Sequence, residues 1–357
     1  MTVHTARGAI QDLPVAFHES ILGLYLDDRA TEIFAKGRLQ TLAEGEALQS
    51  PGDGALHVLL HGRLIGAHDW FGPGNHFDPA AAAQAGGLVA NGGRAMLWTL
   101  DDAGGALSSA SRDVLGQALA RASAAEAAAS PPATHPDPAR LCDHDHPAIR
   151  RQAVRLRRAS PTSTAKAIFH FVQSMPYRFG HWHECASTTL ARGVGMCTTK
   201  ANLQVALMRA AGLEAGFVET PMPMSRLGKL MPDAWLALMR NEVRHYFAAV
   251  RLNGTWWACD ASYDDAAFNI YIETMPELAF LIPAFFDEGR PYSPAYAAKG
   301  TDPTDITVMP DLQGVMGKAS RFGPRHFEAL NTKADRARGW HRRDLSAAPE
   351  MRNEAAG

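Results

Sequence analysis

The sequence has few cysteines and no long hydrophobic run. Only four of its 357 residues are cysteine, at irregular positions: Cys142, Cys185, Cys197 and Cys259. So few and irregular cysteines argue against a disulfide framework and fit a reducing compartment, so we expect a cytoplasmic protein. The first twenty residues lack a basic segment followed by an apolar stretch, so a signal peptide is not expected. No apolar run approaches the length that crosses a bilayer, so no membrane association is expected.

An excess of charge of one sign is also missing. The chain has 35 lysines and arginines against 37 aspartates and glutamates, which gives a formal net charge of −2. This balance provides no global field for nucleic acid, so no nucleic-acid partner is expected. The histidine pairs His144-x-His146 and His181-x-His183 lack the spaced Cys/His pairs of a zinc site. We expect these histidines to be solvated or locally hydrogen-bonded, with no metal and no other cofactor.

What the chain does have is a cysteine at the start of a strongly apolar segment. Cys197 follows the sequence GVGM of residues 193–196, and residues 201–211 are too continuously apolar for a surface helix. We predict a helix that is buried nearly all round and that Gly212 ends. A thiol in its first turn would face unpaired backbone N–H groups and the positive dipole end, which stabilise the nucleophilic thiolate. The alternative is that Cys197 is a small buried hydrophobe.

A second feature is a predicted β-hairpin over residues 244–260. Asn253-Gly254 between two apolar, aromatic-rich runs is the strongest short-range hairpin signal. A two-residue turn sets a register in which Asp260 lies opposite Phe247, and His245 shares the face of Phe247 because side chains alternate. His245 and Asp260 are then diagonal neighbours, about 7–8 Å apart at the backbone and within reach of a side-chain hydrogen bond. A slip of one residue would put them on opposite faces.

Cys197, His245 and Asp260 occur in the order of the Cys-His-Asp arrangement of nucleophilic acyl chemistry. In that arrangement the imidazole takes the thiol proton and the carboxylate holds the imidazole tautomer. Singly, His245 is also explained as a satisfied core histidine and Asp260 as a strand-end cap. Jointly, the order and geometry favour a catalytic triad. Cys259 faces away from Asp260 by strand alternation, so we interpret it as a packing residue.

Several motifs of this region occur together in a recognisable order. They are Gly195-x-Cys197, the helix end Arg209-Ala210-Ala211-Gly212, His245-x-Phe247, Gly254-x-Trp256 and Asp260-Ala261-Ser262. Over about residues 141–265 they resemble the core of the transglutaminase-like superfamily, which belongs to the papain-like cysteine fold. The resemblance implies Cys197 as nucleophile, His245 as general base and acid, and Asp260 as orienting carboxylate.

The resemblance leaves the reaction open. Members of the superfamily include protein cross-linking enzymes, peptidases, peptide N-glycanases, amide-forming enzymes and inactive relatives. Thr198-Thr199 departs from the acidic or aromatic residues that many relatives carry after the cysteine. In relatives an upstream aromatic or amide side chain helps to bind the oxyanion, and Trp182 is the candidate here. The backbone N–H of Cys197 is a further donor, since helix-start amides point where the oxyanion forms.

The first 130 residues follow a different pattern. From residue 39 onward, short strands broken by glycine and proline predict a β-sandwich or jelly roll. An alanine-rich stretch at residues 106–129 predicts a helix after them. The order of turn residues resembles that of cyclic-nucleotide-binding domains over about residues 34–122: Gly45-Glu46, Pro51-Gly52-Asp53, Gly62, Pro73-Gly74-x-x-Phe77 and Ala90.

The resemblance to cyclic-nucleotide-binding domains does not extend to the ligand. In that family a glutamate after the Phe-Gly pair and an arginine shortly afterwards hold the phosphate. Here Phe77-Asp78-Pro79 takes the place of the Phe-Gly pair and its glutamate. The next arginine in the chain is Arg94. An anionic phosphate without a guanidinium or a backbone nest is poorly bound. We therefore expect the fold without nucleotide binding, used for homodimerisation or for regulation of the second domain.

The sequence thus predicts an α+β chain of four parts. They are an N-terminal β-roll or jelly roll with a C-terminal helix at residues 1–130, a proline-rich linker at 131–140, a papain-like transglutaminase-core domain at 141–320, and a polar, disordered tail at 321–357. The predicted function is cysteine-dependent acyl transfer or amide hydrolysis on a peptide or small amide. Two alternatives stay open, a cyclic-nucleotide-responsive regulatory protein and a binding protein whose triad is idle.

Overall fold

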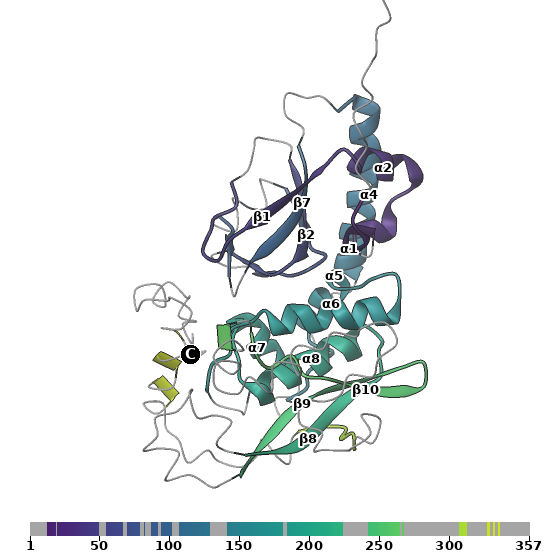
Figure 1. The fold of residues 1–357 in the computed structure, drawn as a ribbon. Helices are drawn as coiled ribbons and strands as arrows, with labels where there is room; N and C mark the ends of the chain where they lie inside the picture. Colours follow the sequence, from purple (N-terminus) through teal and green to yellow (C-terminus); the bar gives the residue numbers. More distant parts are fainter. Residues whose placement is uncertain are drawn as a thin grey trace, which may run out of the picture.

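The structure is a computed structural model. It describes residues 13–18, 20–49, 55–66, 70–78, 82, 87–91, 94–101, 107–128, 141–180, 184–223, 242–264, 266–267, 307–312, 327–328, 331–332 and 335. These residues form an N-terminal body of short strands and helices and a C-terminal body in which helices pack on a sheet (Figure 1). Within these ranges, no helix is long and apolar enough to cross a membrane. The predicted linker at 131–140 and Trp182 lie outside the described residues.

The N-terminal body contains two antiparallel sheets. Their strands are β1 (Arg38–Leu42), β2 (Leu56–His61), β3 (Leu64–Ile65), β4 (Trp70–Phe71), β5 (His76–Phe77), β6 (Val89–Ala90) and β7 (Ala95–Leu100). One sheet has the order β1-β7-β2-β5 and the other the order β4-β3-β6. The strands are short, as predicted, while the jelly-roll and cyclic-nucleotide-binding-like assignments stay predictions.

Helices cover one side of the four-stranded sheet. They are α1 (Val15–His18), the 3-10 turn η1 (Gly23–Tyr25), α2 (Asp28–Phe34) and the long α4 (Ser109–Ala128). Asp27 caps α2 by accepting a hydrogen bond from the backbone N–H of Ala30. One apolar cluster joins Phe34 of α2, Val58 of β2 and Leu115 of α4. The predicted helix at residues 106–129 is therefore confirmed, with slightly shorter bounds.

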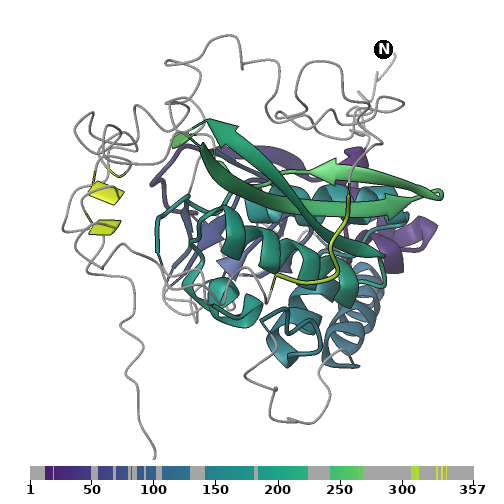
Figure 2. The same ribbon diagram turned by 90° about the horizontal axis from the view of Figure 1, so that it is seen from below.

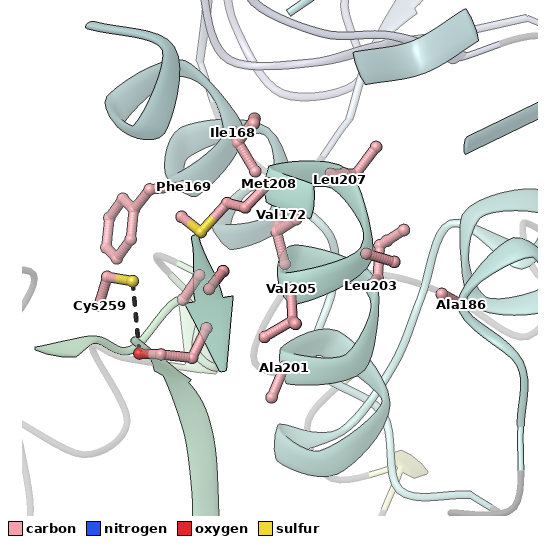
Figure 3. Close-up of a cluster of buried hydrophobic side chains, with 14 of the residues drawn as sticks. Ile168, Phe169, Val172, Ala186, Ala201, Leu203, Val205, Leu207, Met208 and Cys259 are labelled. Carbon is pink, nitrogen blue, oxygen red and sulfur yellow. Dashed lines mark hydrogen bonds between the residues drawn. The ribbon is translucent and has the colours of Figure 1, made fainter. Parts of the chain in front are cut away.

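The C-terminal body is organised around a buried helix, α8 (Cys197–Ala210). Every residue from Cys197 to Met208 is buried, which confirms the helix predicted to be buried on all sides. Its neighbours are the helices α5 (Pro147–Arg155), α6 (Pro161–Gln173) and α7 (Ala186–Arg192). Figure 3 shows apolar side chains of α6 and α8 meeting in one core, with Cys259 among them.

A three-stranded antiparallel sheet of order β10-β9-β8 covers the other side of α8. Its strands are β8 (Ala215–Pro223), β9 (Glu242–Leu252) and β10 (Thr255–Cys259). The two turn residues Asn253 and Gly254 have φ values of 51° and 82°, and such left-handed conformations are what a tight hairpin turn requires. Cys259 pairs with Ala248, so the predicted register is confirmed. Figure 2 shows this sheet from below, lying across the helices.

Part of the predicted tail packs against the C-terminal body. Phe327, Asn331 and Asp335 are buried. The Asn331 side chain accepts from the N–H of Phe179 at 2.8 Å and donates to its carbonyl at 2.9 Å. Asp335 forms an ion pair with Arg178 at 2.9 Å. The side chains of Asn331 and Asp335 therefore bind groups of the domain, while disorder of residues 321–357 as a whole stays a prediction.

Candidate active site

Cys197 is the first residue of α8 and is 8% exposed. The segment before it is held on several sides. Gly193 ends α7 in the left-handed conformation, with φ 62°. Gly195 donates to the carbonyl of Pro176 at 3.2 Å, and its own carbonyl accepts from the N–H of Arg178 at 2.9 Å. These bonds fix the point at which the cysteine enters the helix.

His245 of β9 and Asp260, the residue after β10, lie side by side as the hairpin register predicts. The Nε2 atom of His245 is 2.6 Å from Oδ2 of Asp260, and both side chains are almost fully buried. The other carboxylate oxygen of Asp260 accepts from the N–H of Ser262 at 3.0 Å and from its hydroxyl at 2.5 Å. Both oxygens therefore have partners, and the carboxylate is held in one orientation.

Cys197 lies near the imidazole as well, because its side chain is among the groups that raise the pKa of His245. The structure therefore brings the three predicted residues into one cluster. Because Nε2 faces Asp260, Nδ1 is the ring nitrogen left for the sulfur. Burial lowers the pKa of His245, but the charge and hydrogen bond of Asp260, with smaller contributions from Cys197, raise it to about 10. Burial likewise raises the pKa of Asp260, yet the imidazole and Ser262 hold it below its usual value. The buried pair is therefore an imidazolium and a carboxylate near neutral pH.

Aromatic rings surround the imidazole. The ring of Tyr263 stacks on that of His245, with centroids 6.0 Å and planes 6° apart, and Phe247 lies 5.8 Å away. Tyr263 in turn contacts Tyr177 at 5.0 Å. Neither tyrosine is among the residues that the sequence predicts for the site. The position of Tyr263, three residues after Asp260, is the signal that could have identified it.

The other cysteines are set apart from this cluster. Cys259 is buried, and its Sγ donates to the carbonyl of Ala248 at 3.3 Å (Figure 3). Burial, with the charge of Asp260, raises the pKa of Cys259. Burial and two neighbouring carboxylates also raise the pKa of Cys185. The prediction that Cys259 is a packing residue is therefore confirmed.

Histidine pairs in the described part of the chain make local bonds. The ring of His146 accepts from the N–H of Ala148 at 3.2 Å, and His144 lies 3.3 Å from the carbonyl of Cys142. Among the residues that the structure describes, no group of three His, Cys, Asp or Glu side chains could hold a metal ion. Trp182, His181 and His183 lie outside the described residues.

Two further features lie on α8, a buried threonine beside the cysteine and a cavity farther along the helix. Thr198, directly after the cysteine, is buried, and its hydroxyl has no hydrogen-bond partner among the described residues. A cavity of about 230 Å³ lies farther along α8 and is lined by Leu141, Cys142, Asn202, Arg209, Pro310, Asp311 and Leu312. This cavity does not include the triad residues. Arg209 there donates to the carbonyls of Ala215 and Pro310, so its guanidinium holds chain segments together.

One family model matches the part of the chain that contains this site. Residues 150–261 match the model of the Transglutaminase-like superfamily and form a transglutaminase-like domain. This stretch contains Cys197, His245 and Asp260, and the match supports a cysteine-type enzyme in general terms. The match does not extend to the N-terminal body.

Two other comparisons add little. A search of the curated proteins found no match. One solved structure, from Cytophaga hutchinsonii and provisionally named a cysteine protease, is 14% identical, covers 62% of this chain and 71% of its own, and has a TM-score of 0.27. This likeness is too distant to inform the function.

Proposed function

We propose, from the transglutaminase-like domain at residues 150–261, that this protein is a cysteine enzyme of acyl transfer or amide hydrolysis. Cys197 is the nucleophile, His245 the general base and acid, and Asp260 the orienting carboxylate. The observation that carries the proposal is the buried hydrogen bond between His245 and Asp260, with Cys197 among the groups that act on the same imidazole. A thiol beside a buried imidazole that a carboxylate orients is the arrangement of an activated nucleophile.

The reaction follows from the positions of these groups. The sulfur of Cys197 attacks the carbonyl carbon of an amide, and its proton resides on His245, whose raised pKa favours the protonated ring. The negative oxygen of the tetrahedral intermediate accepts from the backbone N–H of Cys197 at the start of α8. When the carbon–nitrogen bond breaks, His245 gives its proton to the departing amine, and a thioester of Cys197 is left.

A second half-reaction releases the acyl group. Water or an amine attacks the thioester carbonyl and gives its proton to His245, and the thiol leaves with that proton. Water gives hydrolysis and an amine gives a new amide, so the acceptor decides between the two outcomes. The substrate class is a peptide or a small amide. The chemistry needs neither a metal nor an organic cofactor. None of the four cysteines is in a disulfide, which is consistent with a reducing cytoplasm.

The N-terminal body completes the proposal. We propose that residues 1–130 form a cyclic-nucleotide-binding-like roll that regulates the second domain or forms a homodimer, and that it does not bind a nucleotide. The support is the short antiparallel strands followed by a long helix and the absence of an arginine between Phe77 and Arg94. Calorimetry with cyclic nucleotides tests this, and micromolar binding would favour the alternative of a nucleotide-responsive regulatory protein.

Thiol labelling tests the central proposal. The native protein is treated with iodoacetamide near neutral pH, and the labelled positions are found by peptide mapping. We expect stoichiometric labelling at Cys197, its loss in Cys197→Ala, and slower labelling in His245→Ala. Labelling spread evenly over the four cysteines would contradict the nucleophile assignment. A labelled but inert protein, tested against amide and thioester probes, would point to an idle triad instead.

A further inference from the structure

A buried arginine of the N-terminal body reaches the segment that carries the nucleophile. Arg63 lies between β2 and β3 and is fully buried. Its Nη1 atom donates to the carbonyl oxygen of Gly193 at 2.8 Å, across a sequence separation of 130 residues. Gly193 caps the C-terminal end of α7 and stands four positions before Cys197. The N-terminal body therefore touches the chain immediately before the candidate nucleophile.

The arginine is anchored in its own body on the other side. A second arm of the guanidinium donates to the side-chain oxygen of Asn91, and the N–H of Asn91 donates to the carbonyl of Arg63 at 3.0 Å. The cation is thus held in place and presents one donor to Gly193. If that bond were broken, a buried carbonyl would lose a partner that water cannot replace. The contact is therefore costly to lose and restrains both partners.

The segment that Arg63 contacts, residues 193–196, needs an external restraint. Residues 193–196 include two glycines, and glycine has the least intrinsic conformational restriction. The carbonyl of Gly193 lies at the C-terminal end of α7, where carbonyls have no partner within the helix. Farther along, Gly195 is bonded to Pro176 and Arg178, and the N–H of Met196 donates to the hydroxyl of Thr199 at 3.0 Å. Arg63 fixes the beginning of this segment, and the other bonds fix its end.

Other side-chain contacts between the described residues of the two bodies lie near α6, away from residues 193–196. The guanidinium of Arg158, which precedes α6, donates to the carbonyl of Pro73. The rings of His61 and His170 meet at 5.9 Å, and Gly72 packs so closely on Phe171 that a Cβ atom would overlap its ring. These contacts join the N-terminal body to α6 and its preceding turn. Arg158 therefore resembles Arg63 in residue type, in burial and in donating to a carbonyl of the other body, but it does not contact the segment before Cys197.

We propose that Arg63 is a positioning residue for the active site. By holding the Gly193 carbonyl it fixes residues 193–196, and it thereby sets the place from which the sulfur of Cys197 faces His245. The N-terminal body is then a structural part of the catalytic site. That Arg63 positions the Cys197 sulfur for catalysis rests on the proposed function of Cys197. That Arg63 restrains residues 193–196 does not depend on this function.

The test compares three variants of the full chain: Arg63→Met, Arg63→Lys and Arg158→Met. Two quantities are measured, the rate of iodoacetamide labelling at Cys197 between about pH 5 and pH 9, and amide hydrogen exchange at Gly195 and Met196. Urea unfolding reports the stability of each variant. Arg63→Met removes the donors but keeps an unbranched side chain. Arg63→Lys keeps the charge and restores a donor without the planar fork.

We expect Arg63→Met to label on the order of tenfold more slowly, with a changed pH profile, because a displaced reacting atom loses its alignment with the base. Exchange at Gly195 and Met196 should rise in this variant. Arg63→Lys should recover part of both effects. Arg158→Met should lose stability and keep the rate and the exchange of the native protein at this segment. If Arg63→Met fails to fold, Arg63→Lys against Arg158→Met makes the same comparison, with partial effects expected in Arg63→Lys alone.

The outcomes separate this inference from the proposed function. Native exchange in Arg63→Met, or equal effects in Arg158→Met, would overturn the positioning role. Poor labelling of Cys197 in the native protein, with exchange still raised in Arg63→Met, would overturn the proposed function and retain the restraint by Arg63.

Discussion

The rings of His245 and Tyr263 lie parallel, with centroids 6.0 Å apart and planes inclined by 6°. The face of an aromatic ring carries partial negative charge, so this arrangement favours the protonated imidazole. Tyr263 also packs on Tyr177, which pairs with Gly195 through an isolated β-bridge. A continuous series of contacts, two between rings and one between backbones, therefore runs from His245 to Gly195, two residues before Cys197.

Removal of the Tyr263 ring should lower the pKa of His245. We expect Tyr263→Ala to lower this pKa by about 0.4–1.5 units, because a buried cation–π contact is worth about 0.5–2 kcal/mol. Tyr263→Phe keeps the ring and serves as the control, with little change expected. NMR titration of the imidazole measures the shift in both variants. An equal shift in the two variants would assign the effect to the hydroxyl and contradict the stacking interpretation.

Stability should depend on pH through the buried pair. The pKa of His245 is about 10 in the folded protein against 6.5 ordinarily, so protonation stabilises the fold fully below pH 6.5 and this contribution is lost toward pH 10. The pKa of Asp260 is lowered, so its contribution is present above 3.8 and is lost on acidification below it. Urea unfolding between about pH 6 and pH 9.5 should show the alkaline loss. In Asp260→Asn the loss should be smaller, and equal slopes would contradict the assignment.

A methyl group at Gly195 should disturb the start of α8. A Cβ atom there would lie 2.6 Å from Oγ1 of Thr199 and 3.1 Å from Cγ of Lys200. Displacing the Thr199 hydroxyl would also remove the cap of Met196. We expect Gly195→Ala to lower the free energy of unfolding by about 1–3 kcal/mol and to slow labelling of Cys197.

A matched glycine substitution provides the control for this effect. Gly116 lies inside α4, and a Cβ atom there would meet nothing within 4 Å. Gly116→Ala should therefore stabilise the protein by about 0.5–1 kcal/mol. Urea unfolding compares the two variants. Destabilisation of similar size in both would show that the crowding at Gly195 is not the cause.

The Asn331 side chain should stabilise the C-terminal body. Asn331→Ala leaves both backbone groups of Phe179 without their partner, so we expect a loss of about 1–3 kcal/mol in the free energy of unfolding. The neighbouring Thr332 makes an exposed hydrogen bond to Glu328, and Thr332→Ala should change stability by less than about 0.5 kcal/mol. Equal and small effects would contradict the stabilising role of the Asn331 side chain.

Local patterns in the sequence predicted much of the candidate site. The Asn253-Gly254 turn determines the register of its hairpin, and the register alone brings His245 beside Asp260. The continuous apolar run after Cys197 similarly predicts a helix inside the core. Both signals act over short distances in the chain, where turn geometry and side-chain periodicity dominate.

Contacts between distant segments could not be predicted in this way. Arg63 and Gly193 are joined only by tertiary packing, and an arginine after a glycine turn has no pattern that names its acceptor. Asn331 and Asp335 lie in a polar stretch whose composition is typical of a solvated tail, yet they bind Phe179 and Arg178. Polar composition indicates disorder only where no backbone or charged partner lies within reach.

The burial of α8 from Cys197 to Met208 has a consequence for the lifetime of the thiol. Beyond its first turn the helix cannot open without opening the core around it, so the amide protons of this part exchange through global unfolding. Damage to the sulfur by oxidants too large to enter the folded site would require the same event. The conformational stability of the whole domain therefore also sets how long the enzyme keeps its reactive group intact.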